Sequence, residues 1–296
     1  MKNRGIYVVM VLVASSCYGI VTPLIKVAYS HGFTVGDVTN SQYVIASILL
    51  WLMTAFVRKG GRISPKQWML LVMLGLMGAG TSYTYYYALN YLPASLGIVL
   101  LFQFAWIILI FEIIATRRVP SKEKWIGVVI ILLGTVFAVN LFGERFLRFP
   151  LWAVILGLLS AVFFAGLQYF SGYVDTQISS PLRSAIVMTV STLAIMPVFP
   201  PTYLVSGALG KGLWLYGALI ALFYQAIPLV LTLIAVPRVG GRVAGILACV
   251  ELPVAIFASA MFLRERTLLI EWVGVLVIIV GMVISEWTLF KRSQTT

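Results

Sequence analysis

Long apolar runs separated by short polar connections fill this chain of 296 residues. A helix needs about 20 mainly apolar residues to cross the hydrocarbon core of a bilayer. Ten runs of about that length follow one another, at 5–28, 37–57, 67–89, 94–115, 124–142, 151–172, 183–205, 212–236, 240–262 and 268–290. The composition agrees, since 61% of the residues are hydrophobic and 10% are charged, against about 45–50% and 25% in soluble domains. The sequence therefore predicts an all-α integral membrane protein with ten transmembrane helices.

The basic residues predict how the chain is oriented, because cytoplasmic loops of membrane proteins are enriched in Lys and Arg. With the N-terminus in the cytoplasm, fifteen of the 21 Lys and Arg residues lie on the inner side and six on the outer side. We therefore expect a multi-pass protein of the cell (inner or plasma) membrane with both termini cytoplasmic. The same clustering argues against a nucleic-acid partner, which needs a basic surface stripe.

The first apolar run has a second interpretation. It follows Lys2 and Arg4 and contains the small residues Ala14-Ser15-Ser16, as a cleaved signal peptide would. Because the run continues to Ile25, a first transmembrane helix is the preferred interpretation.

An internal repeat divides the chain into two halves. The pattern Trp125-Ile126-Gly127-Val128 through Gly134 recurs as Trp272-Val273-Gly274-Val275 through Gly281, an offset of 147 residues. We predict one five-helix repeat over 1–143, a second over 151–290 and a short cytoplasmic tail at 291–296. Because five is odd, the second repeat enters the membrane from the opposite side, and inverted repeats are typical of secondary transporters. Chance similarity between apolar segments is the alternative.

The repeated glycines also predict close helix packing. Gly127 and Gly134 are seven residues apart, as are Gly274 and Gly281, and small residues let transmembrane helices approach closely. The contacts they make lie either within one chain or between two chains of a homodimer.

Glu251 is the strongest candidate for a functional residue. It lies in the middle of the run 240–262, where a carboxylate costs on the order of 2.5–3.5 kcal/mol and is retained where it has a role. Its helical neighbours are all alanines, at positions 244, 248, 255 and 258, and Pro253 removes a backbone donor nearby. We expect a proton-coupling site or a partner for a substrate ammonium group; a structural hydrogen bond to another helix is the alternative.

Other polar and aromatic residues within the apolar runs are candidates for the same substrate site. Gln103 is related to Glu251 by an offset of 148, and Trp106 lies one turn further on the same face. Tyrosines with hydroxyl tips would suit an amphipathic ligand, although such stripes often only pack. The remaining candidates are Tyr83, Tyr87 and Asn90 on one helical face, and Gln168 and Gln225, which could equally hold helices together.

Catalytic and cofactor motifs are not found in the sequence. It has no phosphate-binding loop, and its single histidine, His31, stands at the end of the first run, so no nucleophile triad is found. Two isolated cysteines, Cys17 and Cys249, give no disulfide framework or metal site. We expect no enzyme, no cofactor and no metal; Glu251 alone is too little for an intramembrane enzyme.

The chain resembles the drug/metabolite transporter superfamily, and within it the EamA-type bacterial members. The resemblance covers nearly the whole chain and rests on two short motifs. The first is Tyr18-Gly19 through Lys26, and the second is Glu265-Arg266 followed by Trp272, Gly274 and Gly281. The first repeat departs from the second motif, because Arg117-Arg118 stands where the family has an acid. The resemblance implies cytoplasmic termini, a central cavity between the halves and transport of small metabolites.

Residues and resemblance together favour a secondary transporter that exports small amphipathic metabolites, such as amino acids or analogues, by alternating access. Its partners would be a small-molecule substrate and the lipid bilayer. A nucleotide-sugar exchanger is an alternative, but it would need basic residues in mid-helix, and none is found. A membrane scaffold or sensor that does not transport is the other alternative.

Overall fold

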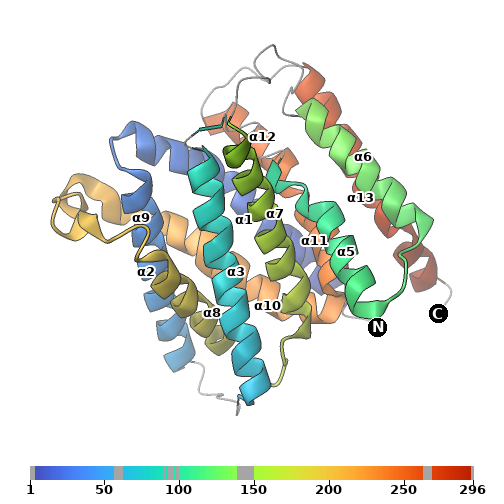
Figure 1. The fold of residues 1–296 in the computed structure, drawn as a ribbon, viewed down its shortest axis with the longest axis horizontal. Helices are drawn as coiled ribbons and strands as arrows, with labels where there is room; N and C mark the ends of the chain where they lie inside the picture. Colours follow the sequence, from blue (N-terminus) through green and yellow to red (C-terminus); the bar gives the residue numbers. More distant parts are fainter. Residues whose placement is uncertain are drawn as a thin grey trace.

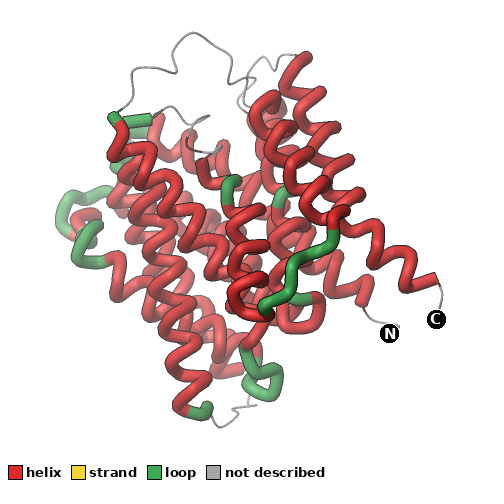
Figure 2. Tube along the Cα trace, turned by 45° about the vertical axis from the view of Figure 1, so that its right-hand side comes forward, coloured by secondary structure: helices red, strands yellow, loops and turns green. Residues whose placement is uncertain are grey.

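We analysed a computed structural model of the chain, which describes residues 4–56, 63–89, 91–92, 97, 100–138, 150–262 and 269–294. Every regular element in these ranges is a helix, as Figure 2 shows. Asn90, the motif residues Glu265 and Arg266, and the side chain of Lys26 lie outside the described residues.

The described part of the first half contains five helices, with a further helical fragment before the fourth. In chain order the helices are α1 (Arg4–Ser30), α2 (Val35–Phe56), α3 (Pro65–Leu89), α5 (Phe104–Thr116) and α6 (Lys122–Ala138). Local signals explain where α2 and α3 begin. Thr34 and Asp37 form a capping box at α2, with the Asp37 amide donating to Thr34 Oγ1 over 3.1 Å. Ser64 accepts from the Gln67 amide at α3, whose first residue is Pro65.

The described part of the second half also follows five apolar segments, but two of them are irregular. The helices are α7 (Leu151–Phe170), α8 (Ser180–Ile195), α9 (Trp214–Ile220), α10 (Ile227–Val239), α11 (Gly241–Ala248), α12 (Glu251–Phe262) and α13 (Leu269–Gln294). Two π-helical stretches, η4 (Leu209–Leu213) and η5 (Ala221–Ala226), join α9 to its neighbours. Short 3₁₀ turns occur at η2 (Ser171–Tyr173) and η3 (Thr202–Leu204).

One predicted helix is too long. The run 183–205 predicts a helix to residue 205, but α8 ends at Ile195 and the chain continues irregularly. Pro197, Pro200 and Pro201 lack the amide hydrogen that a helix requires at each step.

Each half packs against the other through equivalent pairs of helices. Helix α1 packs on α10 and α12, and α7, its counterpart in the second half, packs on α3 and α5. The counterpart pairs α2 with α8 and α6 with α13 pack on each other. In Figure 1, α1 starts near the N label in the lower half of the view and α7 starts at the top. The halves are thus inverted with respect to each other.

The glycines of the repeat pack within the chain. A Cβ added to Gly134 would lie 2.8 Å from the backbone nitrogen of Ile278, and one added to Gly281 would lie 2.8 Å from the carbonyl oxygen of Gly127. The glycine faces of α6 and α13 therefore contact each other. Of the two alternatives that the sequence leaves open for these residues, the structure uses the contact within one chain.

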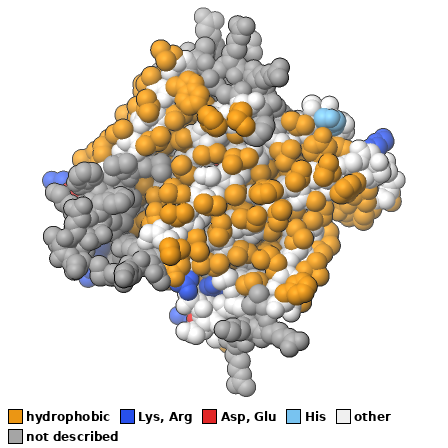
Figure 3. All heavy atoms as spheres, turned by 180° about the vertical axis from the view of Figure 1, so that it is seen from behind, with side chains coloured by type: hydrophobic (Ala, Val, Ile, Leu, Met, Phe, Trp, Pro, Cys, Tyr) orange, Lys and Arg blue, Asp and Glu red, His pale blue; other side chains and the backbone are white. Residues whose placement is uncertain are grey.

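The outer surface of the bundle is apolar. Figure 3 shows hydrophobic side chains over most of the described face, with Lys and Arg near its margins. Three of the described helical stretches are long and apolar enough by themselves to cross a membrane: Val35–Phe56, Leu151–Tyr173 and Leu209–Val239. Shorter apolar helices lie in five of the seven remaining predicted spans, at Gly5–Val21, Phe104–Thr116, Ser180–Ile195, Val243–Ala258 and Trp272–Gly281.

Candidate functional site

A cavity lies between the two halves of the molecule. Its walls come from α1, α2, α3 and Leu101 in the first half, and from α7, η5 and α12 in the second. It measures about 70 Å³, enough for a handful of water molecules. It lies where two core clusters of the described residues meet, since its wall residue Phe164 belongs to one and Tyr43 to the other. The lining residues are Tyr18, Tyr43, Gly78, Thr81, Ser82, Tyr85, Tyr86, Leu101, Phe164, Leu167, Tyr224, Gln225 and Glu251.

Glu251 is the one residue of this lining with a formal charge. It is the first residue of α12, where the positive end of the helix dipole favours a carboxylate. Within the described part of the chain, no hydrogen bond or ion pair of its carboxylate is found. The hydroxyls of Tyr18, Tyr85 and Tyr224 lie close enough to interact with it electrostatically. Among the described residues, this acidic group thus has tyrosines near it and no fixed partner.

The break before Glu251 has a counterpart in the first half. Both helices are interrupted by two tight turns, each closed by a backbone hydrogen bond between residues three apart. In the first half these bonds run from Gln103 N to Leu100 O and from Ala105 N to Phe102 O. In the second half, 147 residues later, they run from Val250 N to Leu247 O and from Leu252 N to Cys249 O. Pro253 cannot donate to the carbonyl of Cys249, which explains the second break. Interrupted helices at equivalent positions of two repeats mark the binding sites of many transporters.

The π-helical stretch η5 brings two neighbouring side chains into the cavity. Tyr224 and Gln225 are consecutive, and both line it. Pro228 has no amide hydrogen to donate to the carbonyl of Tyr224, so a regular α-helix cannot continue here. Such π-bulges occur frequently at functional sites.

The walls from different helices are joined by polar and aromatic contacts. The hydroxyl of Tyr43 on α2 lies 2.6 Å from Ser82 Oγ on α3, and the Gln225 amide from the second half is a further partner of Tyr43. The rings of Tyr18 on α1 and Tyr224 meet edge to face, with centroids 5.1 Å apart. The cavity is thus held by contacts that link both halves.

The structure brings only two of the residues predicted for the site together in the cavity, Glu251 and Gln225. Gln103 is not among the lining residues; its Oε1 accepts a hydrogen bond of 2.8 Å from Trp106 Nε1. Gln168 is buried in α7 and also lies outside the lining. Asn90 is outside the described residues.

The tyrosine run on α3 presents a different face to the cavity from the one expected. Tyr85 and Tyr86 line it, whereas Tyr83 and Tyr87 are 37% and 40% exposed, and their rings contact each other at a tilt of 55° with centroids 5.2 Å apart. The expected wall of Tyr83 and Tyr87 is therefore replaced by its neighbours. Periodicity alone could not tell the faces apart, because tyrosines occupy four of the five positions 83–87.

Three further lining tyrosines were not predicted. Tyr18, Tyr43 and Tyr224 come from separate helices. Each stands in an apolar run where a single tyrosine is unremarkable. The one signal in the sequence was the glycine that follows Tyr18. In the structure, a Cβ added to Gly19 would lie 2.6 Å from the carbonyl oxygen of Glu251. That close approach sets α1 directly against the start of α12.

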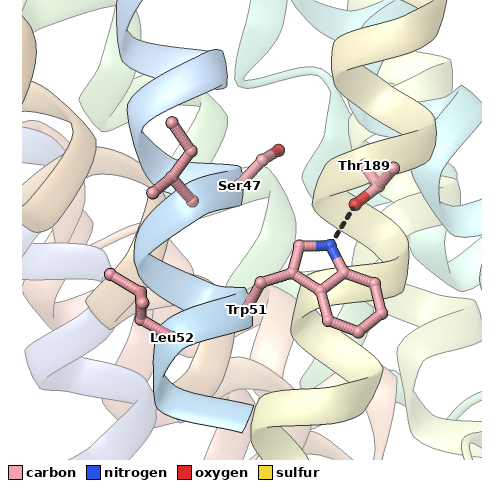
Figure 4. A pocket seen from close by; sticks show the side chains of 5 residues that line it. Ser47, Trp51, Leu52 and Thr189 are labelled. Atoms are coloured by element: carbon pink, nitrogen blue, oxygen red, sulfur yellow. Dashed lines mark hydrogen bonds between the residues drawn. The ribbon is translucent and has the colours of Figure 1, made fainter. Parts of the chain in front are cut away.

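A second hollow, of about 410 Å³, lies on the outside of the bundle between α2 and α8 (Figure 4). It is lined by Ser47, Ile48, Trp51, Leu52 and Thr189, and Trp51 Nε1 donates to Thr189 Oγ1 over 2.9 Å. Ile48, Trp51 and Leu52 are each about half exposed on the apolar surface of the bundle. With no charged lining residue, this hollow is the weaker candidate for a substrate site.

Comparison with known proteins identifies the family. The model of the EamA-like transporter family matches residues 5–140 and again residues 151–287. The chain belongs to this family. The prediction of an all-α membrane protein with two repeats related to the drug/metabolite transporters is thereby confirmed.

Individual relatives agree with this assignment. The chain is 25% identical over 295 residues to the uncharacterized transporter YcbK of Bacillus subtilis, covering 93% of this chain and 91% of the relative. It is 26% identical over 161 residues to the pseudopaline exporter CntI of Pseudomonas aeruginosa, where the match spans about half of each protein, 54%. The chain also aligns with the chain of a solved crystal structure over the full length of both, with a TM-score of 0.75 at 15% sequence identity. This match shows a similar fold. The chain is a membrane transporter of the EamA-like family.

Proposed function

We propose that the chain is a secondary transporter that exports small amphipathic metabolites, such as amino acids or their analogues, by alternating access. The observation that carries this proposal is the cavity between two inverted halves, with the carboxylate of Glu251 exposed to it and no fixed partner for that carboxylate among the described residues. Export is supported by the partial match to the pseudopaline exporter. No catalytic activity is part of the proposal.

The proposed transport cycle requires the halves to separate at one end at a time. Contacts between the halves occur at both ends of the bundle. At one end Thr202 Oγ1 donates to Asp37 Oδ1 over 3.0 Å. At the other end the Asp175 amide donates to Gln67 Oε1 over 3.0 Å. Breaking the contacts at one end of the bundle while those at the other end persist would open the cavity to one side of the membrane.

The proposal places the chain in the cell membrane with both termini in the cytoplasm. This follows because most Lys and Arg residues lie in segments on the same side of the membrane as the N-terminus. The end containing Gln67 and Asp175 then faces the cytoplasm, and the end containing Asp37 and Thr202 faces outward. A homodimer remains a prediction; the glycine faces that were one candidate for its interface pack within the chain.

Proton coupling through Glu251 is part of the proposal. A carboxylate enclosed by protein and without a fixed partner can carry either a proton or a cationic substrate, and exchange between them would couple the two flows. Among the described residues, those that interact with it electrostatically include the hydroxyls of Tyr18, Tyr85 and Tyr224 and the thiol of Cys249. None of these is a cation that would neutralise it permanently.

The alternative of a nucleotide-sugar exchanger has less support. Phosphate groups are bound in proteins mainly by Arg, Lys or backbone amides. No Lys or Arg is found among the described residues that line the cavity. A diphosphate would therefore bring at least two negative charges next to Glu251 without compensation.

The test is counterflow in proteoliposomes with a mixed pool of amino acids and the amines derived from them. Wild type is expected to exchange one or a few compounds and to accumulate them when a pH gradient is imposed. Glu251→Gln should lose this activity, and Glu123→Gln, the same change at an exposed position, should retain it. Full activity of Glu251→Gln under a pH gradient would refute proton coupling. Exchange of nucleotide sugars instead would refute the substrate class.

A further inference from the structure

The charge of the cavity constrains what it can bind. Its lining contains one carboxylate, and tyrosine, serine, threonine and glutamine side chains are neutral at physiological pH. When it is deprotonated, Glu251 brings a negative charge that no basic side chain among the described lining residues balances. An occupant with one positive charge would balance it, whereas a second negative charge would not be balanced.

The aromatic walls favour a cation for an independent reason. Ring faces carry negative potential and attract ammonium groups. Tyr18 and Tyr224 meet at 80° with centroids 5.1 Å apart, and both lie within electrostatic range of Glu251. Both rings line the cavity beside this carboxylate, so a ring face of either is available to a cation bound there. Tyr85 contributes a third hydroxyl-bearing ring on the side of α3.

The hydrogen-bonding groups of the wall point to the same class of ligand. The Thr81 hydroxyl donates its hydrogen to the carbonyl of Met77 over 2.9 Å. Tyr43 and Ser82 are bonded to each other, so one of their two hydrogens is also used. The oxygens keep lone pairs that can accept from a ligand. An ammonium group offers three donors and no acceptor, so it can donate to these oxygens.

The size of the cavity indicates that the charged head of the ligand is what it recognises. About 70 Å³ accommodates a small polar group, whereas sites for complete drug-sized ligands measure about 300–1,000 Å³. A longer apolar tail would be accommodated as the halves separate. The rest of the wall next to the polar groups, Leu101, Phe164 and Leu167, is apolar.

We propose that this cavity selects monocationic amines, held through the ammonium group by Glu251 and by the faces of Tyr18 and Tyr224, and that such amines bind more tightly than the amino acids from which they derive. The inference rests on the proposed transport function and narrows its substrate class. A free carboxylate on the ligand, as in an amino acid, would find no basic partner among the described lining residues.

The experiment compares three ligands that share one skeleton. Phenethylamine is a cation, phenylalanine is a zwitterion and N-acetylphenethylamine is neutral; isoamylamine and leucine repeat the first comparison without an aromatic ring. Binding is measured with the purified full chain in detergent by the ligand-dependent shift in Tm, and transport by counterflow in liposomes. We expect at least one amine to bind about tenfold or more tightly than its amino acid, the factor that corresponds to about 1.4 kcal/mol.

Two pairs of variants test the residues. Glu251→Gln should lower amine affinity by about tenfold or more while Glu123→Gln leaves it unchanged. Tyr224→Phe keeps the ring and should retain affinity, whereas Tyr224→Leu should weaken it by about 2- to 30-fold, the range expected for a cation–π contact. If Glu251→Gln does not fold, as judged by its Tm without ligand, the two Tyr224 variants still provide the test.

Each outcome discriminates between the claims. Equal binding of the zwitterion or the neutral amide, or binding of no amine, would overturn the inference. Counterflow of amino acids but not of amines would overturn it and leave the transport function standing. Amine binding that depends on Glu251 without any counterflow would support the inference and contradict the proposed transport.

Discussion

Thr202 Oγ1 donates a hydrogen bond of 3.0 Å to Asp37 Oδ1, and the two residues belong to opposite halves of the chain. The other carboxylate oxygen accepts from Thr34 Oγ1 over 2.7 Å. Nearby, Tyr203 donates to Asn40 Oδ1 over 3.1 Å, and Asn40 Nδ2 donates to the carbonyl of Phe199. These contacts join the start of α2 to the connection after α8, where separation of the halves would open that end.

Thr202→Val is therefore expected to favour the conformation open at this end. Asp37 is 7% exposed, and a hydrogen bond to a buried charge contributes about 1.5–3 kcal/mol. The change should increase labelling of a cysteine introduced at Tyr43→Cys by an impermeant maleimide added outside, in a background without the native cysteines. Unchanged labelling would show that this contact does not hold the end closed. Thr189→Val, on the lipid-facing surface, is the matched control.

An equivalent prediction concerns the opposite end of the helix bundle. Gln67 on α3 bonds through both amide atoms to the second half, to the amide of Asp175 at 3.0 Å and to the carbonyl of Tyr173 at 3.3 Å. Gln67→Leu removes both bonds and should favour opening at the end that contains them, by about 1 kcal/mol because the site is partly exposed. Labelling from the other face should rise, and the double variant with Thr202→Val should restore a balance near that of wild type. Additive labelling at both faces would contradict alternating access.

The hydrogen bond between Tyr43 and Ser82 predicts a measurable coupling at the cavity wall. Removing one hydroxyl leaves the other without this partner, so Tyr43→Phe and Ser82→Ala should each lower the free energy of unfolding by about 1–3 kcal/mol. The double variant should lose less than the sum, with a coupling of about 0.5–1.5 kcal/mol. Thermal unfolding of the four proteins in one detergent measures this. Strict additivity would mean that the 2.6 Å contact has no net effect on stability.

The glycine seam between α6 and α13 predicts a stability defect without a specific transport defect. A Cβ at Gly134 would lie 2.8 Å from backbone nitrogen of Ile278, so Gly134→Ala forces the helices apart. We expect a loss of about 1–3 kcal/mol, as in overpacked cores, seen as a lower Tm. Gly210→Ala is the control, because no atom lies within 4 Å of its added Cβ. An unchanged Tm for Gly134→Ala would mean that α6 and α13 separate easily.

Several features of the fold could be predicted because they depend on local properties of the chain. The apolar runs predict spanning helices from transfer free energy alone, and the matching Trp-Gly-Gly spacing predicts two repeats; the family model matches each repeat separately. The isolation of Glu251 in an apolar run also singled it out, and it lies in the cavity wall. The end of α8 was misjudged because hydropathy does not register the missing amide hydrogens of three prolines.

The remaining features were decided by tertiary structure. Whether Tyr85 or Tyr83 faces the cavity depends on how α3 is rotated against α7 and α8, and hydropathy gives both faces nearly the same value. Gln103 is paired with Trp106, whereas Glu251 lies in the cavity wall. The two breaks are offset by 147 residues and the two side chains by 148, so Gln103 and Glu251 do not occupy equivalent positions at the breaks. Transfer to lipid is a sum over local residues, so the amino-acid pattern alone predicts a chain that crosses a membrane as two copies of one unit. Which side chains meet at the centre depends on the rotation and close approach of helices distant in sequence, so it becomes visible only in the folded molecule.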